Sequence, residues 1–330
     1  MAEDFTWRDG ERTIRFGRGA LADAPGLLGE GYTLLTTERA RASAPQLADA
    51  AGAVVLVARG RVDELAGDLL AAGPPRAPLV ALGGGRVIDV AKALAAAAGA
   101  GAVVAAVPTT LSAAEMTWVH RHARGVDPST PRVRPRIVLN DPALSASQPP
   151  AELAASAANA LGHAIEGSLT AVATPVPTLA ARDAARRLAL ALPAAGEPDR
   201  DELALAALLS GYAIDANWYG LHHVMSQTLV RAAGIGHGPA NAAMLPVTSA
   251  ALRRRSPEGF ALLDAQLDEP AEDVARRFAR LAGTVRLRDL GVAQEALDAC
   301  AQSASQRAEL ALTPPPAGPR ELGELYREAW

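Results

Sequence analysis

The sequence predicts an α/β domain with a parallel sheet, followed by an all-α domain, and three observations support this prediction. At roughly 150 residues per domain, a chain of 330 residues is long enough for two. In residues 1–149, short apolar runs alternate with helical patterns, which is typical of βαβ units. In residues 150–330, long segments rich in alanine and leucine repeat with a helical period, and no convincing strand is found.

The first domain is expected to hold four parallel strands with helices between them. The predicted strands are 32–37, 53–57, 78–82 and 102–107, and the predicted helices begin near Glu38 and cover 62–72 and 87–98. Residues 111–149 are proline-rich and are predicted to be an irregular connection. The second domain is predicted to be helical throughout, with a loop at 314–316 before a last short helix.

Composition excludes several classes of protein. With 49% hydrophobic and 21% charged residues, the chain is not expected to be disordered. A net charge of -4 without a basic stripe argues against a nucleic-acid partner. No signal peptide and no membrane span is read from the sequence, and Cys300 is the only cysteine, so we expect a reducing, cytoplasmic location.

A run of three glycines is the first candidate for a binding site. Gly83, Gly84 and Gly85 end an apolar strand and precede a helix, whose first N–H groups can bind a phosphate. Asp89 and Lys92 lie three residues apart on that helix, and Lys92 is the only lysine of the chain. The alternative is a tight turn without a ligand.

Histidines in the second half form the other candidate site. Asn159 and His163 are four residues apart, as are His223 and Gln227, so each pair shares one face of a helix. His237 lies in a glycine-rich break between helices. Side chains from these three places could converge on one divalent metal, or each histidine could have a purely structural role.

Several motifs occur in an order that is typical of one family. They are Gly83-Gly-Gly-Arg-Val-Ile-Asp89-Val-Ala-Lys92, Pro108-Thr-Thr-Leu-Ser-Ala-Ala-Glu115-Met-Thr117, Asp141-Pro142, Asn159-Ala-Leu-Gly-His163-Ala-Ile-Glu166, and Leu221-His-His223 with His237. From about Phe16 to Val247 the chain resembles the iron-containing alcohol dehydrogenase family, and within it the maleylacetate reductase branch. The resemblance implies a Rossmann-like domain before a helical one, the architecture that this family shares with dehydroquinate synthase.

The resemblance also implies an activity and its residues. It implies an oxidoreductase that uses NADH or NADPH to reduce the conjugated double bond of a small unsaturated keto acid, and a homodimer. The implied cofactor-binding residues are Gly83, Gly84, Gly85, Arg86, Asp89, Thr109, Thr110, Ser112 and Thr36. The candidate catalytic residues are His163, His222, His223, His237, Asn159 and Gln227.

The chain departs from the family at residues that bear on cofactor and metal. Arg86 replaces a serine that binds the pyrophosphate, and alanines replace a Gly-Ser pair at Ala113 and Ala114. Asn159 replaces an aspartate, which leaves His163, His223, His237 and Asn159 as an uncharged donor set. A divalent metal has donors here but is not expected.

Further departures keep the alternatives open. Gln227 replaces a histidine that moves protons, and Arg231 replaces a glycine and offers a guanidinium to a substrate carboxylate. Glu38 favours a free ribose hydroxyl, as in NADH, whereas Arg39 favours the extra phosphate of NADPH. A repurposed enzyme of non-redox acid–base chemistry, such as a cyclisation or dehydration, and a metal-dependent alcohol dehydrogenase both remain alternatives.

Overall fold

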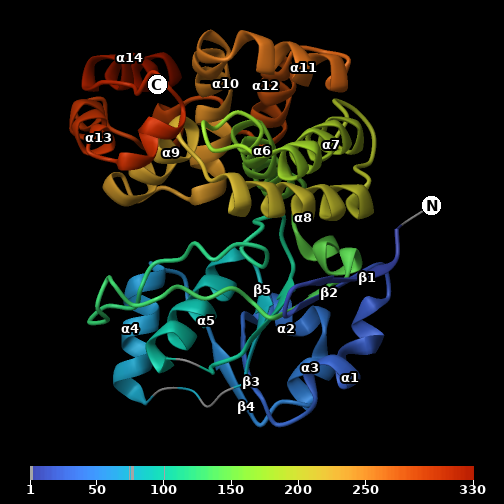
Figure 1. The fold of residues 1–330 in the computed structure, drawn as a ribbon. Coiled ribbons are helices and arrows are strands. Elements are labelled where there is room, and N and C mark those ends of the chain that lie inside the picture. The colour runs from blue at the N-terminus through green and yellow to red at the C-terminus, as the bar shows by residue number, and fades with distance from the viewer. Residues whose placement is uncertain (1–2, 74, 76–77, 100) are drawn as a thin grey trace. The chain divides into compact units, whose positions relative to one another are not determined.

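The computed structural model describes residues 3–73, 75, 78–99 and 101–330. The chain divides into two compact units, residues 1–148 and residues 149–330 (Figure 1). The first unit combines a sheet with flanking helices, and the second consists of helices. The predicted fold class is therefore confirmed.

The sheet of the first unit has seven strands in the order β1-β2-β7-β6-β5-β3-β4. The strands are β1 (Phe5–Asp9), β2 (Arg12–Phe16), β3 (Thr33–Thr36), β4 (Ala53–Leu56), β5 (Leu79–Gly83), β6 (Val104–Pro108) and β7 (Ile137–Asn140). The four predicted strands appear as β3 to β6, and all their pairings are parallel, as expected. The C-terminal ends of these four strands therefore lie along one edge of the sheet.

Three strands were absent from the sequence-based expectation. β1 and β2 form an antiparallel hairpin, and β2 continues the sheet by pairing in parallel with β7. The prediction that residues 111–149 are irregular is wrong for β7, which has only four residues inside a proline-rich segment. In β2, Thr13 and Arg15 alternate with the buried Ile14 and Phe16, so the strand lacks an apolar run.

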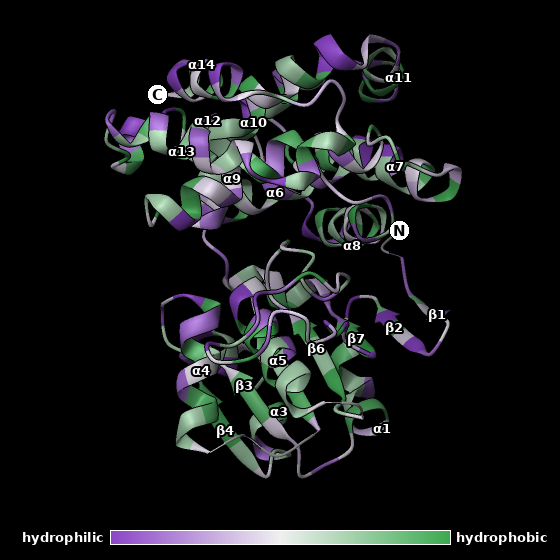
Figure 2. Cartoon of the chain, turned by 60° about the vertical axis from the view of Figure 1, so that its left-hand side comes forward, coloured by the Kyte–Doolittle hydropathy of each residue, from purple (hydrophilic) through white to green (hydrophobic). Residues whose placement is uncertain are grey.

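Alternate residues of each strand point to opposite faces of the sheet, and helices pack on both faces. In β5, Leu79 and Ala81 pack with α4 and α5, whereas Val80 and Leu82 pack with the helices of the other face. Figure 2 shows the central strands in the hydrophobic colour. The helices of this unit are η1 (Ala20–Asp23), α1 (Ala24–Leu28), α2 (Glu38–Ser43), α3 (Pro45–Asp49), α4 (Val62–Ala72), α5 (Gly85–Ala98) and η2 (Pro142–Ser147).

Lys92 holds the loop that follows β6. Its ammonium group is completely buried and donates to Asp89 Oδ1 at 2.9 Å, to the Ala114 carbonyl at 3.1 Å and to the Val119 carbonyl at 2.9 Å. An ammonium group has three protons, so these contacts satisfy it fully. The single lysine therefore fixes the position of the loop beside the glycine run.

Glu115 lies in the same loop, and we expect it to make the stability of this unit depend on pH. Its side chain is 1% exposed, and burial raises its pKa from 4.5 to about 7. The folded protein then binds one more proton than the unfolded chain between these two pH values. Stability should fall as the pH rises through that window, by about 3 kcal/mol in total.

The Glu115→Gln variant tests this expectation, because an amide does not titrate. We expect the free energy of unfolding, measured with urea, to fall with rising pH in wild type but not in the variant. The value for the variant minus that for wild type should therefore increase from acidic to neutral pH. A difference that stays constant over this range would contradict the assignment.

The second unit is built around α6, which packs against α7, α8, α10 and α12. Residues 149–330 contain no strand, and the loop at 314–316 precedes the last helix, as predicted. Among the described residues, no helix has the length and apolar character needed to cross a membrane. The helices are α6 (Pro150–Gly167), α7 (Pro175–Ala191), α8 (Arg200–Asn217), α9 (Leu221–Ala232), α10 (His237–Arg255), α11 (Pro257–Leu267), α12 (Ala271–Leu281), η3 (Leu287–Leu290), α13 (Ala296–Ser305), η4 (Ala308–Leu312) and α14 (Pro319–Ala329).

Candidate active site

One face of α6 carries three polar side chains into the interior of the helical unit. Asn159, His163 and Glu166 follow one another at intervals of four and three residues, which places them on the same side of the helix. All three are buried, and Glu166 has no exposed surface. Buried polar groups need partners, and α9 supplies those of Glu166.

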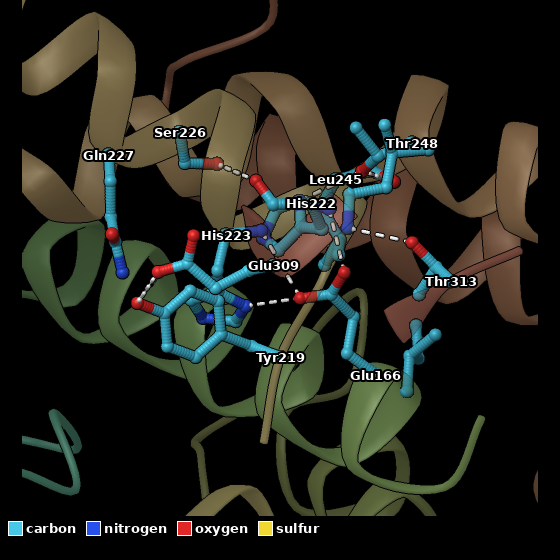
Figure 3. A network of polar contacts seen from close by, with 12 residues as sticks. Glu166, Tyr219, His222, His223, Ser226, Gln227, Leu245, Thr248, Glu309 and Thr313 are labelled. Atoms are coloured by element: carbon cyan, nitrogen blue, oxygen red, sulfur yellow. Dashed lines mark hydrogen bonds and ion pairs between the residues drawn. The ribbon is translucent and has the colours of Figure 1, made fainter. Parts of the chain in front are cut away.

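Glu166 binds the first turn of α9. Its Oε1 accepts the N–H of His222 at 2.7 Å, and its Oε2 accepts the N–H of His223 at 3.2 Å (Figure 3). These N–H groups have no partner inside their own helix, and a carboxylate is favourable at this positive end. Gly162 permits the close approach, because a Cβ there would lie 2.7 Å from His222 Nε2.

His223 is held in a single tautomer by the same carboxylate. Its Nδ1 lies 2.7 Å from Glu166 Oε2. Burial raises the pKa of Glu166, but its two oxygens already accept the backbone N–H groups of His222 and His223, an arrangement that favours the carboxylate, so we assign the proton of this contact to Nδ1. Nε2 then carries a lone pair, and it is buried without a hydrogen-bond partner among the described residues. Burial lowers the pKa of His223 to about 3, so the ring is neutral near pH 7.

His163 stacks on His223. The two ring centroids are 4.7 Å apart and the ring planes differ by 14°. Burial, followed by the charges of neighbouring histidines, lowers the pKa of His163 well below its ordinary value. The site therefore contains two neutral, parallel imidazoles, of which His163 is 7% exposed and His223 3%.

His222 faces a different environment. Its ring is completely buried, and Nδ1 lies 2.8 Å from the Thr248 hydroxyl of α10. Because Thr248 donates its own proton to the Met244 carbonyl, it accepts from His222. Burial and then His223 lower the pKa of His222 to about 3. We therefore assign this residue to the packing of α9 on α10 rather than to proton donation.

The other two predicted residues lie around the histidine pair. His237 is the first residue of α10 and is exposed, yet close enough for its charge to lower the pKa of His163 and His223. Gln227 is one turn after His223 on α9, and its Oε1 accepts from Arg307 at 3.3 Å. His163, His223, His237 and Gln227 are thus brought together by three helices.

Sequence reasoning missed Glu166 as a functional residue, and it missed a cluster formed by Tyr219, Arg307 and Glu309. The Tyr219 ring centroid is 5.7 Å from that of His223, and its hydroxyl lies 3.3 Å from Glu309 Oε1 (Figure 3). Glu166 ends the motif that begins at Asn159, so its three-residue spacing from His163 could have indicated that both lie on one face of the helix. No local pattern connects residue 307 with residue 227.

The residues of the histidine cluster do not fit a resident iron. Among the residues that the structure describes, no three histidine, cysteine or acidic side chains are arranged to hold a metal ion. The rings of His163 and His223 are stacked, so the nitrogen lone pairs of the two rings lie in two nearly parallel planes. Asn159 contributes an amide and no charge to this donor set.

The glycine run of the first unit forms a close contact with the loop after β6. A Cβ on Gly84 would lie 3.0 Å from Thr110 Cγ2, and one on Gly85 would lie 2.9 Å from Ser112 Cβ. Gly84 caps α5 without a side-chain hydrogen bond, which leaves the helix terminus accessible to a ligand. Glycine is therefore required here for packing, and the positive end of α5 is available to an anion.

The remaining predicted cofactor residues surround this helix terminus or support it. Arg86 is half-buried, its Nε has no partner among the described residues, and burial followed by the charge of Arg59 lowers its pKa. Thr36 and Thr109 are buried at the ends of β3 and β6. Asp89 binds Lys92 and so supports the loop. An unpaired guanidinium beside a helix N-terminus fits a phosphate group.

The chain combines a mostly parallel sheet that has a glycine-rich turn with a helical unit that holds a buried histidine cluster. Residues 153–330 match the sequence model described as "Fe-containing alcohol dehydrogenase family, C-terminal". The chain belongs to the iron-containing alcohol dehydrogenase family.

Individual relatives agree with this assignment. The chain is 31% identical to maleylacetate reductase 1 of Rhodococcus opacus over 268 residues, which cover 76% of this chain and 72% of the relative. It is 30% identical over 214 residues to the 1,3-propanediol dehydrogenase of Citrobacter freundii, which covers 59% of this chain and 55% of that one. Maleylacetate reductase from Agrobacterium tumefaciens has a similar structure, with a TM-score of 0.81, 27% identity, and coverage of 100% of this chain and 99% of that one.

Proposed function

We propose that the protein uses NADH or NADPH to reduce the carbon–carbon double bond of a small unsaturated keto acid such as maleylacetate, giving the saturated keto acid. The observation that carries this proposal is the neutral His163–His223 pair, in which Glu166 fixes the tautomer of His223. The neighbouring position on α6 is Asn159, so an amide stands where a carboxylate ligand of a metal would be needed. Relatives named maleylacetate reductases support the substrate class.

The glycine run and its surroundings fit the dinucleotide. Gly83, Gly84 and Gly85 permit close approach of a pyrophosphate to the start of α5, and Arg86 supplies a guanidinium that has no anionic partner among the described side chains. When bound, the reduced nicotinamide supplies a hydride to the β-carbon of the conjugated double bond. Thr110 and Ser112 form the opposite wall of this cradle.

Addition of a hydride to the double bond places negative charge on the ketone oxygen and requires a proton at the neighbouring carbon. We assign His163 to the oxygen, as a hydrogen-bond donor. We assign His223 Nε2 to the proton, which it takes up and delivers while Glu166 offsets the charge of the transient imidazolium. His237 is exposed and links the pair to solvent. Asn159 and Gln227 orient the substrate.

The test is to mix the protein with NADH or NADPH and maleylacetate and to follow the nicotinamide absorbance. We expect oxidation of at least one nucleotide only when the keto acid is present, and the same rate after treatment with a chelator. Lack of nucleotide binding and of oxidation would contradict the proposal. Turnover without nucleotide would favour non-redox chemistry, and recovery of a chelator-sensitive alcohol oxidation would favour a metal-dependent dehydrogenase. By family resemblance we also expect a homodimer in the cytoplasm.

A further inference from the structure

Arg307 reaches the histidine cluster from the end of the chain. Its Nη2 donates to Gln227 Oε1 at 3.3 Å and to the Tyr219 hydroxyl at 3.2 Å. Gln227 follows His223 by one turn, and the ring of Tyr219 lies beside that of His223. The guanidinium is therefore placed next to the two side chains that flank the proposed proton carrier.

Glu309 fixes the plane of the guanidinium. Arg307 Nε donates to Glu309 Oε2 at 3.0 Å and Nη2 donates to Glu309 Oε1 at 2.7 Å, so the two groups form a bidentate pair. Side-chain exposure is only 17% for Arg307 and 22% for Glu309. A pair of this geometry holds the guanidinium in one orientation and restricts rotation of its long side chain.

One nitrogen of this guanidinium remains without a partner. Nη1 of Arg307 is buried and makes no hydrogen bond within the part of the chain that the structure describes. Leaving a buried N–H unsatisfied is costly, more so on a charged group. In contrast, the Nε and Nη2 atoms of the same residue are satisfied by protein groups. The unmet donor points to an oxygen ligand that is bound during function.

We propose that Arg307 Nη1 binds a carboxylate of the substrate, an assignment that rests on the proposed function because that substrate class is a dicarboxylate. A carboxylate oxygen forms the strong, charge-assisted hydrogen bond that a guanidinium nitrogen prefers. Arg231, which the sequence offered either as a candidate for this task or as a surface arginine, is exposed at the last turn of α9. Arg307 instead lies among the residues of the site.

The experiment compares Arg307→Met with wild type on maleylacetate and on its two monomethyl esters. With the dicarboxylate we expect KM to rise by about tenfold to a hundredfold in the variant, while kcat stays within a few fold. With one of the two esters, wild type and variant should have similar KM values, because the bound carboxylate is already missing. A purely structural arginine would instead raise KM equally for all three compounds, and that result would overturn the proposal.

A binding measurement separates this proposal from the proposed reaction. Isothermal titration of wild type with adipate, a saturated dicarboxylate, needs no turnover, and we expect binding that Arg307→Met abolishes and Arg307→Lys weakens. The matched control is Arg255→Met, which removes another buried arginine, paired with Glu321 at 2.7 Å at the end of α10. It should bind adipate as wild type does. Adipate binding that is equal in wild type and Arg307→Met, or absent from both, would overturn the assignment even if the protein reduces maleylacetate.

Discussion

Replacing Glu166 with glutamine should lower kcat/KM for reduction by about two to four orders of magnitude. The carboxylate accepts the N–H groups of His222 and His223 and the Nδ1 proton of His223. A glutamine of the same shape has one accepting oxygen, and its NH2 group would face donors. We expect His223 to adopt the other tautomer or to turn its ring, and its imidazolium would lose the compensating charge.

Steady-state kinetics and nucleotide binding together check this prediction. The loss should appear mainly in kcat, and the dissociation constant of NADH should stay near its wild-type value, because the nucleotide cradle lies in the other unit. Glu321→Gln is the control, since Glu321 also binds a buried side chain, Arg255, but lies outside the histidine cluster. Activity of Glu166→Gln close to that of wild type would show that His223 does not depend on the carboxylate.

Gly85→Ala should weaken nucleotide binding by about tenfold or more. A Cβ at this position would lie 2.9 Å from Ser112 Cβ and 3.0 Å from Ser112 Oγ. These atoms are close to the backbone and cannot move independently of it. The start of α5 and the loop after β6 must therefore separate, and the proposed phosphate-binding surface would lose its shape.

Fluorescence titration with NADH measures the effect, and two further variants define its cause. Gly26→Ala is the matched control, because a Cβ there meets nothing within 4 Å. Adding Ser112→Gly to Gly85→Ala removes the colliding atom and should restore part of the affinity. If Gly85→Ala binds NADH as tightly as wild type, the glycine serves the turn alone and the cradle lies elsewhere.

Local patterns were sufficient to predict most of the first unit. Val62–Ala72 appears as α4 with the predicted bounds, and the strands β3 to β6 coincide with continuous apolar runs. In β3, β5 and β6 such runs arise because strands buried on both faces need apolar residues at nearly every position, whereas β4 lies at the edge of the sheet and is largely exposed. β1 and β2 carry arginines near one edge of the sheet, and the carbonyls of Pro135 and Glu115 accept protons of the buried Arg12. Those contacts span more than 100 residues and leave no local pattern.

The same distinction applies to the site. The four-residue spacing of Asn159 and His163 could be read from the sequence, and the structure places both in the interior of α6. The roles of His222 and His223 could not be separated in this way. They are adjacent in the chain, yet one donates to Thr248 and the other to Glu166. Arg307 was unpredictable because 80 residues separate it from Gln227.

The measurement that tests the central claim most directly is the tautomer of His223 by nitrogen NMR of protein with labelled histidine, assigned with a His223→Gln variant. We predict a neutral ring with the proton on Nδ1 and an unprotonated Nε2 between about pH 5 and pH 8. We further predict that Glu166→Gln changes this signal. A proton on Nε2 in the wild-type protein, or titration of His223 near neutral pH, would contradict the proposed proton carrier.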